Sequence, residues 1–202
     1  YFDYLPISQR FLLVLVGDVT GHGVPAALVM AMSKAMIFFS SGHDYTPEQI
    51  LETLNWIIFS LMKKKLCMTC VLLWIDTQTH EYSVFNCGHP YPMKRSPDGS
   101  LEELESSGFF LGFRGKLSRL VPKTGVYQPG ERVFLFTDGL VEAIPATNEQ
   151  NGYHLFRDYV AQRPFLPIEE TCRDILDNHC HVLTGKPQPD DFTIVVVERR
   201  EA

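Results

Sequence analysis

Short apolar runs that end or begin beside aspartate residues constrain the fold of this chain more than any other feature. Runs of about four to eight apolar residues bounded by turn residues are typical of buried β-strands, whereas helices need ten or more. Each aspartate therefore stands at the end of a predicted strand, and the ends of neighbouring strands can converge at one edge of a sheet. The pairs are Phe11–Val16 with Asp18, Val133–Phe136 with Asp138, and Phe192–Glu198 with Asp190 and Asp191.

Carboxylates that converge at one edge of a sheet would form a metal site. They repel one another, and protonation or a bound cation must relieve that repulsion. Oxygen-only ligands select hard ions such as Mg²⁺ or Mn²⁺. Two such ions can lower the pKa of a bridging water and clamp a phosphoryl group. The alternative, that these aspartates only form turns, stays open here because Asp is a common turn residue.

The rest of the chain alternates between helical and strand-like segments. Residues Pro25–Ser40 are apolar on most faces, which predicts a well-buried helix. Thr46 and Gln49 have the spacing of a capping box, and Pro47 fits the first position of a helix that we expect to reach about Lys64. Further strands are expected at Cys70–Ile75, Glu81–Asn86, Pro92–Arg95 and Leu101–Leu104, and further helices at Tyr153–Ala161 and Ile168–Val182.

Length and composition predict one globular domain. The chain has 202 residues, of which 45% are apolar and 21% are charged, and this is ordinary for a protein with a single sizeable core. Strands that cluster in the middle of the chain with helices around them predict an α+β layered domain spanning residues 1–202.

The charge distribution argues against nucleic acid or an anionic membrane as the main partner. The net charge is −6 and the pI is about 5.6, whereas such partners need clustered Lys and Arg. The only compact basic run, Lys63–Lys65, follows a predicted helix, where cations interact favourably with the helix dipole. No stretch reaches the roughly 20 apolar residues that a transmembrane helix needs.

Several motifs occur in order along nearly the whole chain. They are DVTGHGVPAA at 18–27, NCGHP at 86–90, SGFFLG at 107–112, PGER at 129–132, FTDGLVEA at 136–143 and DDFT at 190–193. Together they resemble the motifs of the bacterial sporulation stage II protein E type (RsbU-like) serine/threonine phosphatases. These enzymes belong to the metal-dependent type 2C protein phosphatase superfamily.

The resemblance implies a fold and a metal site. The fold would be a four-layer α-β-β-α sandwich, in which two stacked antiparallel sheets are flanked by helices. Two Mn²⁺ or Mg²⁺ ions would bind at one edge, with Asp18 bridging both. Asp138 and Asp190 would hold the second ion, and the carbonyl of Val19 would add a ligand. Asp191 is the alternative to Asp190, because either residue of a tandem pair can point inward.

Other residues near these motifs are candidates for supporting roles. Gly21 and Gly23 are expected to form a turn, and Gly139 to let the chain turn tightly beneath the ions. His22 and His89 are candidate general acids, since a His of near-neutral pKa can protonate a leaving serine oxygen. For both histidines, a structural role in the loop is the alternative.

The first residues suggest that a family motif is cut. Family members begin this domain with Gly-Gly-Asp, followed by aromatic-aromatic-Asp-aromatic, and residues Tyr1–Tyr4 resemble the second half. We therefore expect Gly-Gly-Asp before Tyr1, so that this chain lacks one carboxylate and a strand and has weakened metal binding and low activity. Asp3 would then lie in the second shell of the metals.

The resemblance also implies a reaction and its partners. We expect hydrolysis of phosphoserine or phosphothreonine on a regulatory protein such as an anti-sigma-factor antagonist, by metal-activated water and without a phosphoenzyme. An upstream sensor or receiver domain is expected, a homodimer is compatible with the assignment, and the expected location is cytoplasmic, either free or as part of a membrane-anchored protein. The alternatives are a pseudophosphatase that acts as a regulatory binding module and a two-metal phosphohydrolase that acts on a nucleotide or a small phosphate ester.

Overall fold

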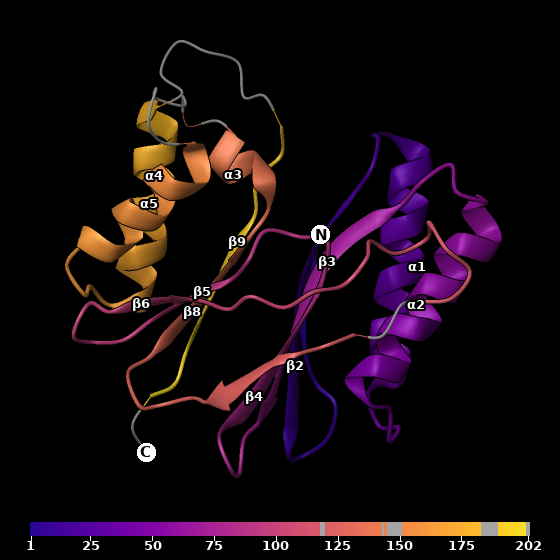
Figure 1. Ribbon diagram of the computed structural model, residues 1–202, viewed down its shortest axis with the longest axis horizontal. Helices are drawn as coiled ribbons and strands as arrows, with labels where there is room; N and C mark the ends of the chain where they lie inside the picture. The colour runs from indigo at the N-terminus through magenta and orange to yellow at the C-terminus, as the bar shows by residue number, and fades with distance from the viewer. Residues whose placement is uncertain (118–119, 143, 145–150, 183–189, 201–202) are drawn as a thin grey trace. The chain divides into compact units, whose positions relative to one another are not determined.

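The computed structural model describes residues 1–202 except 118–119, 143, 145–150, 183–189 and 201–202, and it omits the side chains of 179–182. The chain divides into two compact units (Figure 1). The first contains residues 1–91 and 105–127, and the second contains 92–104 and 128–202. Each unit has one antiparallel sheet and its own helices.

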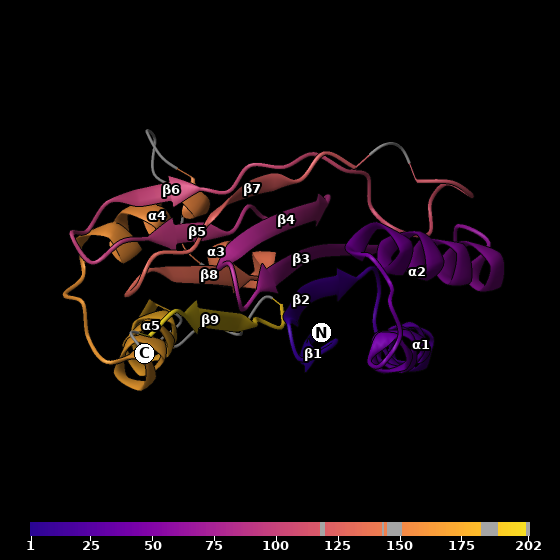
Figure 2. The same cartoon turned by 90° about the horizontal axis from the view of Figure 1, so that it is seen from below.

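The first unit contains a five-stranded sheet in the order β1-β2-β3-β4-β7. Leu13 and Leu15 of β2 and Leu72 of β3 pack in one core with residues of α1 and α2. The two helices therefore cover the same face of the sheet, and Figure 2 shows them side by side. The elements are β1 (Phe2–Pro6), β2 (Phe11–Val19), α1 (Val24–Ser40), α2 (Pro47–Met62), β3 (Met68–Asp76), β4 (Glu81–Cys87) and β7 (Lys123–Val126).

The predicted capping box of α2 is present. The Thr46 hydroxyl accepts from the Gln49 backbone N–H at 3.3 Å, and the Gln49 side chain accepts from the Thr46 N–H at 2.9 Å. The end of this helix differs from the prediction. It ends at Met62, because Lys63 and Lys64 adopt left-handed backbone angles with φ of 48° and 66°.

The second unit contains a four-stranded sheet in the order β6-β5-β8-β9. Phe134 and Phe136 of β8 pack against Phe156 and Val160 of α4 and Ile175 of α5. The elements are β5 (Met93–Arg95), β6 (Leu101–Glu103), β8 (Arg132–Phe136), α3 (Asp138–Glu142), α4 (Gly152–Gln162), α5 (Ile168–Val182) and β9 (Ile194–Glu198).

The predicted α+β class with two antiparallel sheets and flanking helices is confirmed. Three short elements, β1, β7 and α3, were not predicted, because their few and partly polar residues carry no clear periodicity. The single catalytic domain stays a prediction. None of the helices that the structure describes is both long and apolar enough to cross a membrane.

Candidate metal centre

Asp18 lies inside β2 rather than after it, which corrects the predicted end of that strand. The β2–β3 ladder continues to the pairs Asp18–Thr69 and Val19–Met68, so backbone pairing holds both candidate ligands. The Asp18 side chain is half-buried. A carboxylate on the last residues of a paired strand is held in a defined direction, as a metal ligand must be.

The turn after Asp18 depends on two glycines. Gly21 and Gly23 have φ of 86° and 74°, a region that residues with a Cβ rarely adopt. The chain then enters α1 at Val24. His22 lies between the glycines and is exposed. The turn agrees with the expected role of the glycines, while the role of His22 as a general acid stays a prediction.

His89 is built into the loop after β4. It is 6% exposed, and its Nδ1 lies 3.0 Å from the hydroxyl of Thr69, the residue paired with Asp18. Asn86 fixes the loop, since its side chain accepts from the His89 N–H at 2.8 Å and donates to the His89 carbonyl at 2.7 Å. These contacts favour the structural role of His89 over that of a general acid.

The 107–112 motif packs beside the end of β2 that carries Asp18. Met68 and Leu111 exchange two backbone hydrogen bonds of 3.0 and 2.8 Å, and Met68 is paired with Val19. A Cβ at Gly108 would overlap the carbonyl oxygen of Asn86. The motif therefore packs against the strand end that carries Asp18. Sequence reasoning missed Thr69 and Asn86 as supporting residues, although Asn86 lies in a quoted motif.

Asp3 has its own partners in the first unit. Its carboxylate accepts from Lys34 Nζ at 2.8 Å, from the Tyr1 hydroxyl at 3.2 Å and from the Tyr4 N–H at 3.1 Å. Burial, followed by the charge of Asp3, raises the pKa of the Tyr1 phenol. Asp3 faces Leu15 in the β1–β2 ladder, three residues before Asp18 on β2. Its expected place in the second shell stays a prediction.

Asp138 and the tandem aspartates lie together in the second unit. Asp138 begins α3 directly after β8, and Asp190 and Asp191 precede β9, the strand that pairs with β8. Thr137 and Thr193 join the two segments, since the Thr137 N–H donates to the Thr193 carbonyl at 3.1 Å and the Thr193 N–H donates to the Thr137 hydroxyl at 2.8 Å. The structure therefore joins the segments that carry the three aspartates predicted from this part of the chain.

Gly139 is needed for this arrangement, but not for the expected reason. Its φ lies outside the left-handed region, so it does not make a tight turn. A Cβ at Gly139 would instead overlap the Asp191 carbonyl oxygen and lie 3.4 Å from the Asp190 Cβ. The glycine lets the Asp190–Asp191 segment approach the start of α3.

The donor set of the candidate ligands fits Mg²⁺ or Mn²⁺. It consists of carboxylates, with a backbone carbonyl at Val19, and hard divalent ions select such oxygen ligands. The described residues contain no group of three or more His, Cys, Asp or Glu side chains that could hold an ion together. A single site formed by Asp18, Asp138 and Asp190 or Asp191 stays a prediction.

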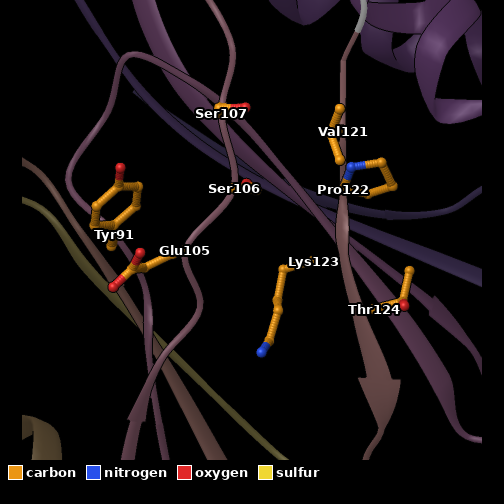
Figure 3. Close-up of a pocket in the computed structure, with 8 residues that line it drawn as sticks. All are labelled: Tyr91, Glu105, Ser106, Ser107, Val121, Pro122, Lys123 and Thr124. Atoms are coloured by element: carbon orange, nitrogen blue, oxygen red, sulfur yellow. The ribbon is translucent and has the colours of Figure 1, made fainter.

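The first unit has a separate cleft of about 390 Å³. It lies where residues 105–107 and 121–124 diverge from the bridge between Ser107 and Val121, and Figure 3 shows Lys123 extending between these segments. The cleft borders β7, which β3 and β4 separate from β2 in the sheet. It contains none of the candidate carboxylates and therefore has no part in the metal centre.

Comparison with known families identifies the relationship that these motifs suggest. The family model described as stage II sporulation protein E (SpoIIE) matches residues 8–200. This chain belongs to the SpoIIE family. The SpoIIE match includes Asp18, Asp138 and the Asp190–Asp191 pair, so every predicted carboxylate ligand lies within it.

Curated relatives and solved structures agree with the SpoIIE assignment. Phosphoserine phosphatase RsbU of Bacillus subtilis is 24% identical over 93% of the chain, and phosphoserine phosphatase RsbP of the same organism is 22% identical over 98%. The chain spans about half the length of these relatives, 55% of RsbU and 48% of RsbP.

Two solved structures share the fold. The RsbU and RsbW domains of a Mycobacterium tuberculosis protein match 99% of this chain, with a TM-score of 0.82 and 28% identity, over 55% of that chain. The SiaA-PP2C domain of Pseudomonas aeruginosa matches 98% of this chain, with a TM-score of 0.83 and 21% identity, over 79% of that chain. The fold is therefore that of a PP2C phosphatase domain.

Proposed function

We propose that this chain is the catalytic domain of a metal-dependent protein serine/threonine phosphatase. The observation that carries the proposal is the placement of Asp138, Asp190 and Asp191 where β8 ends and β9 begins, in a chain that matches the SpoIIE family over residues 8–200. The phosphoserine phosphatases among its relatives, RsbU and RsbP, support the reaction.

The proposed metal site uses the oxygen ligands that the family motifs supply. Asp18 and the Val19 carbonyl would join Asp138 and Asp190, or Asp191 in its place, and hold two Mn²⁺ or Mg²⁺ ions. A structure of RsbX in complex with magnesium, 20% identical to this chain with a TM-score of 0.69, supports the choice of such an ion. When bound, the ions would supply an activated water and neutralise charge on the phosphoryl group.

The chain itself contributes position and rigidity to this reaction. The β2–β3 ladder holds Asp18, and the Thr137–Thr193 hydrogen bonds hold the segments of Asp138 and Asp190. Ligands fixed in advance need no reorganisation when the substrate arrives, and this lowers the barrier of a reaction that depends mainly on positioning. Direct attack by water needs no side-chain nucleophile, so we propose that no phosphoenzyme forms.

The predicted upstream carboxylate has a place in this arrangement. Phe2 pairs with Val16, and the Gly17 N–H donates to the Tyr1 carbonyl at 2.8 Å. A residue that preceded Tyr1 in the same register would lie beside Asp18. This geometry supports the proposal that an aspartate just before Tyr1 completes the site.

We propose that the substrate is a phosphorylated regulatory protein similar to an anti-sigma-factor antagonist. The likeness to RsbU supports this choice. Coverage of about half of that relative is compatible with an upstream sensor or receiver domain and with a homodimer in the whole protein. Cys67, Cys70 and Cys87 are free thiols, which supports a location in the reducing cytoplasm.

The test is Mn²⁺-dependent hydrolysis of p-nitrophenyl phosphate and of a phosphoserine peptide, with and without an added Gly-Gly-Asp before Tyr1. We expect the added residues to raise the rate and Asp138→Asn to abolish it. Asp177→Asn is the matched control, because Asp177 is exposed on α5 in the same unit and should leave the rate unchanged.

Other outcomes would contradict particular parts of the proposal. Equal rates for wild type and Asp138→Asn would show that the chain acts as a binding module rather than as a phosphatase. An unchanged rate after addition of Gly-Gly-Asp would exclude the upstream ligand. Faster hydrolysis of nucleotides than of the phosphoserine peptide would point to a small-molecule phosphohydrolase.

A further inference from the structure

The first unit carries exposed positive charges that the proposed reaction does not use. Residues 53–75 and 106–130 contain no Asp or Glu, although the whole chain has a net charge of −6. Five basic side chains from these segments are exposed, and none of the five forms an ion pair with another described residue. We call them the cationic surface, which consists of Lys63, Lys64, Lys65, Arg114 and Lys116.

Aromatic rings connect the two segments of the cationic surface. Lys64 Nζ lies 5.9 Å from the ring centre of Phe113 and 6.0 Å from that of Phe59. The Arg114 guanidinium lies 4.5 Å from the ring centre of Phe109, which itself packs 5.7 Å from Phe113. Such cation–π contacts hold the charged groups in place without neutralising them, so their charge stays available to a partner.

A buried side chain fixes the loop that carries Arg114. Asn55 of α2 is 1% exposed, donates to the Arg114 carbonyl at 3.0 Å and accepts from the Gly112 N–H at 2.9 Å. Figure 1 shows the loop running alongside α2, and its Gly115 lies against Phe59. The surface therefore has a defined geometry rather than being a set of independent flexible lysines.

The backbone of the lysine run is also unusual. Lys63 and Lys64 both have positive φ, and Lys63 is the left-handed C-cap residue of α2. The helix dipole therefore favours a positive charge at Lys63, whereas Lys64 and Lys65 lie beyond the helix.

The cationic surface is tied to the strand end that carries Asp18. The Thr20 N–H donates to the Cys67 carbonyl at 2.9 Å, and the Cys67 N–H donates to the Thr20 hydroxyl at 2.9 Å. Thr20 lies two residues after Asp18, and Cys67 two residues after Lys65. The segment that follows Asp18 and the segment that follows the lysine run are therefore hydrogen-bonded to each other.

We propose that the cationic surface docks an acidic segment of the phosphorylated protein substrate and directs its phosphoryl group to Asp18. The inference rests on the proposed phosphatase function. Charge complementarity selects an acidic partner and accelerates encounter. A phosphoprotein fits better than an anionic membrane, because the surface adjoins a candidate catalytic residue and the chain as a whole is acidic.

The test uses two phosphoserine peptides, one flanked by glutamates and one by neutral residues. The readout is the ratio of their kcat/KM values, since changes common to both peptides cancel. We expect wild type to prefer the acidic peptide by about tenfold at low salt, as several exposed ion pairs permit. Lys64→Glu with Arg114→Glu should bring the ratio to one or below. Arg173→Glu on α5 is the charge-matched control for either single variant and should keep the ratio.

Binding of the same peptides, followed by fluorescence anisotropy, separates the two proposals. Tighter binding of the acidic peptide without turnover of either would contradict the phosphatase function and keep the docking surface. Turnover with a ratio near one would overturn the docking surface alone. If the double variant unfolds, the single variant Lys65→Glu replaces it, because Lys65 is exposed. Binding to phosphatidylserine vesicles with no preference between peptides would overturn the proposal in favour of a membrane surface.

Discussion

At the scale of single residues, the ion pair between Arg10 and Asp76 makes stability depend on pH. Asp76 is 6% exposed and lies at the end of β3, where Arg10 donates to its carboxylate at 2.7 Å. This hydrogen bond is the main reason that the pKa of Asp76 lies well below its ordinary value, and the backbone N–H groups of Thr79 and Gln78 add to it. The folded state therefore favours the ionised carboxylate more than the unfolded state does.

The contribution of Asp76 to stability should be complete above the unfolded pKa of about 4 and lost as the pH falls towards the lower folded pKa. We expect Asp76→Asn to lower the urea midpoint at pH 7 and to have a smaller effect at pH 3, where part of the contribution is already lost. Urea unfolding at the two pH values measures the difference. An equal loss of stability at the two pH values would show that the charge of Asp76 is not the cause.

Gly139 links a single residue to metal binding. Gly139→Ala should push the Asp190–Asp191 segment away, because the new Cβ would overlap the Asp191 carbonyl. We expect Mn²⁺ affinity, measured by calorimetry, to fall by about 10- to 100-fold, the range found when groups that orient ligands are altered. Loss of thermal stability without any loss of affinity would contradict this role.

At the scale of elements, caps and buried side chains set where helices and loops lie. The capping box places the start of α2 at Pro47, and Asn55 then joins α2 to the loop of Arg114. These two devices position the helix and the loop that carry the cationic surface.

Thr46→Ala removes the acceptor for the Gln49 N–H and should destabilise the protein by about 1 kcal/mol. Thr53→Ala is the control, since Thr53 lies within the same helix and Ala has the higher helix propensity. Urea unfolding measures the stability of both variants. An equal loss of unfolding free energy in the two would argue against a capping effect.

Asn55→Ala should destabilise the protein by about 1–3 kcal/mol, because the buried Gly112 N–H loses its acceptor. The same variant should increase proteolysis of the 109–117 loop. Limited proteolysis and urea unfolding test both effects. A protected loop in the variant would show that other contacts hold it.

At the scale of the whole molecule, bound metal would stabilise the folded protein. An ion that binds only the folded state stabilises it by about 2.7 kcal/mol at a concentration one hundred times its Kd. We therefore expect Mn²⁺ to raise the melting temperature and EDTA to reverse the rise. Asp18→Asn and Asp138→Asn should each reduce the rise, because both carboxylates are proposed ligands.

The control for the first unit is Asp44→Asn, since Asp44 is exposed beyond the end of α1. Calorimetric scans with and without Mn²⁺ provide the measurement. A full rise in Asp18→Asn together with none in Asp138→Asn would show that the ion does not need Asp18 and would contradict the proposed ligand set.

By itself, the sequence determined the elements whose residues carry a strong local signal. The apolar runs of β2, β3, β8 and β9 and the capping box of α2 follow from patterns of neighbouring residues, because strands and helix starts respond to nearby side chains. The motifs around Asp18, Asp138 and Asp190 were also sufficient for the SpoIIE assignment.

Only the tertiary structure decided which distant groups touch. The contacts of Thr69 with His89, Gly139 with Asp191 and Asn55 with the Arg114 loop join residues far apart in the chain, so no local pattern predicts them. The same holds for Lys63 and Lys64, whose left-handed backbone ends α2 and turns an apparent helix-end run into part of a fixed surface. Local propensity decides the elements, whereas burial and close approach between distant segments decide the environment of each side chain.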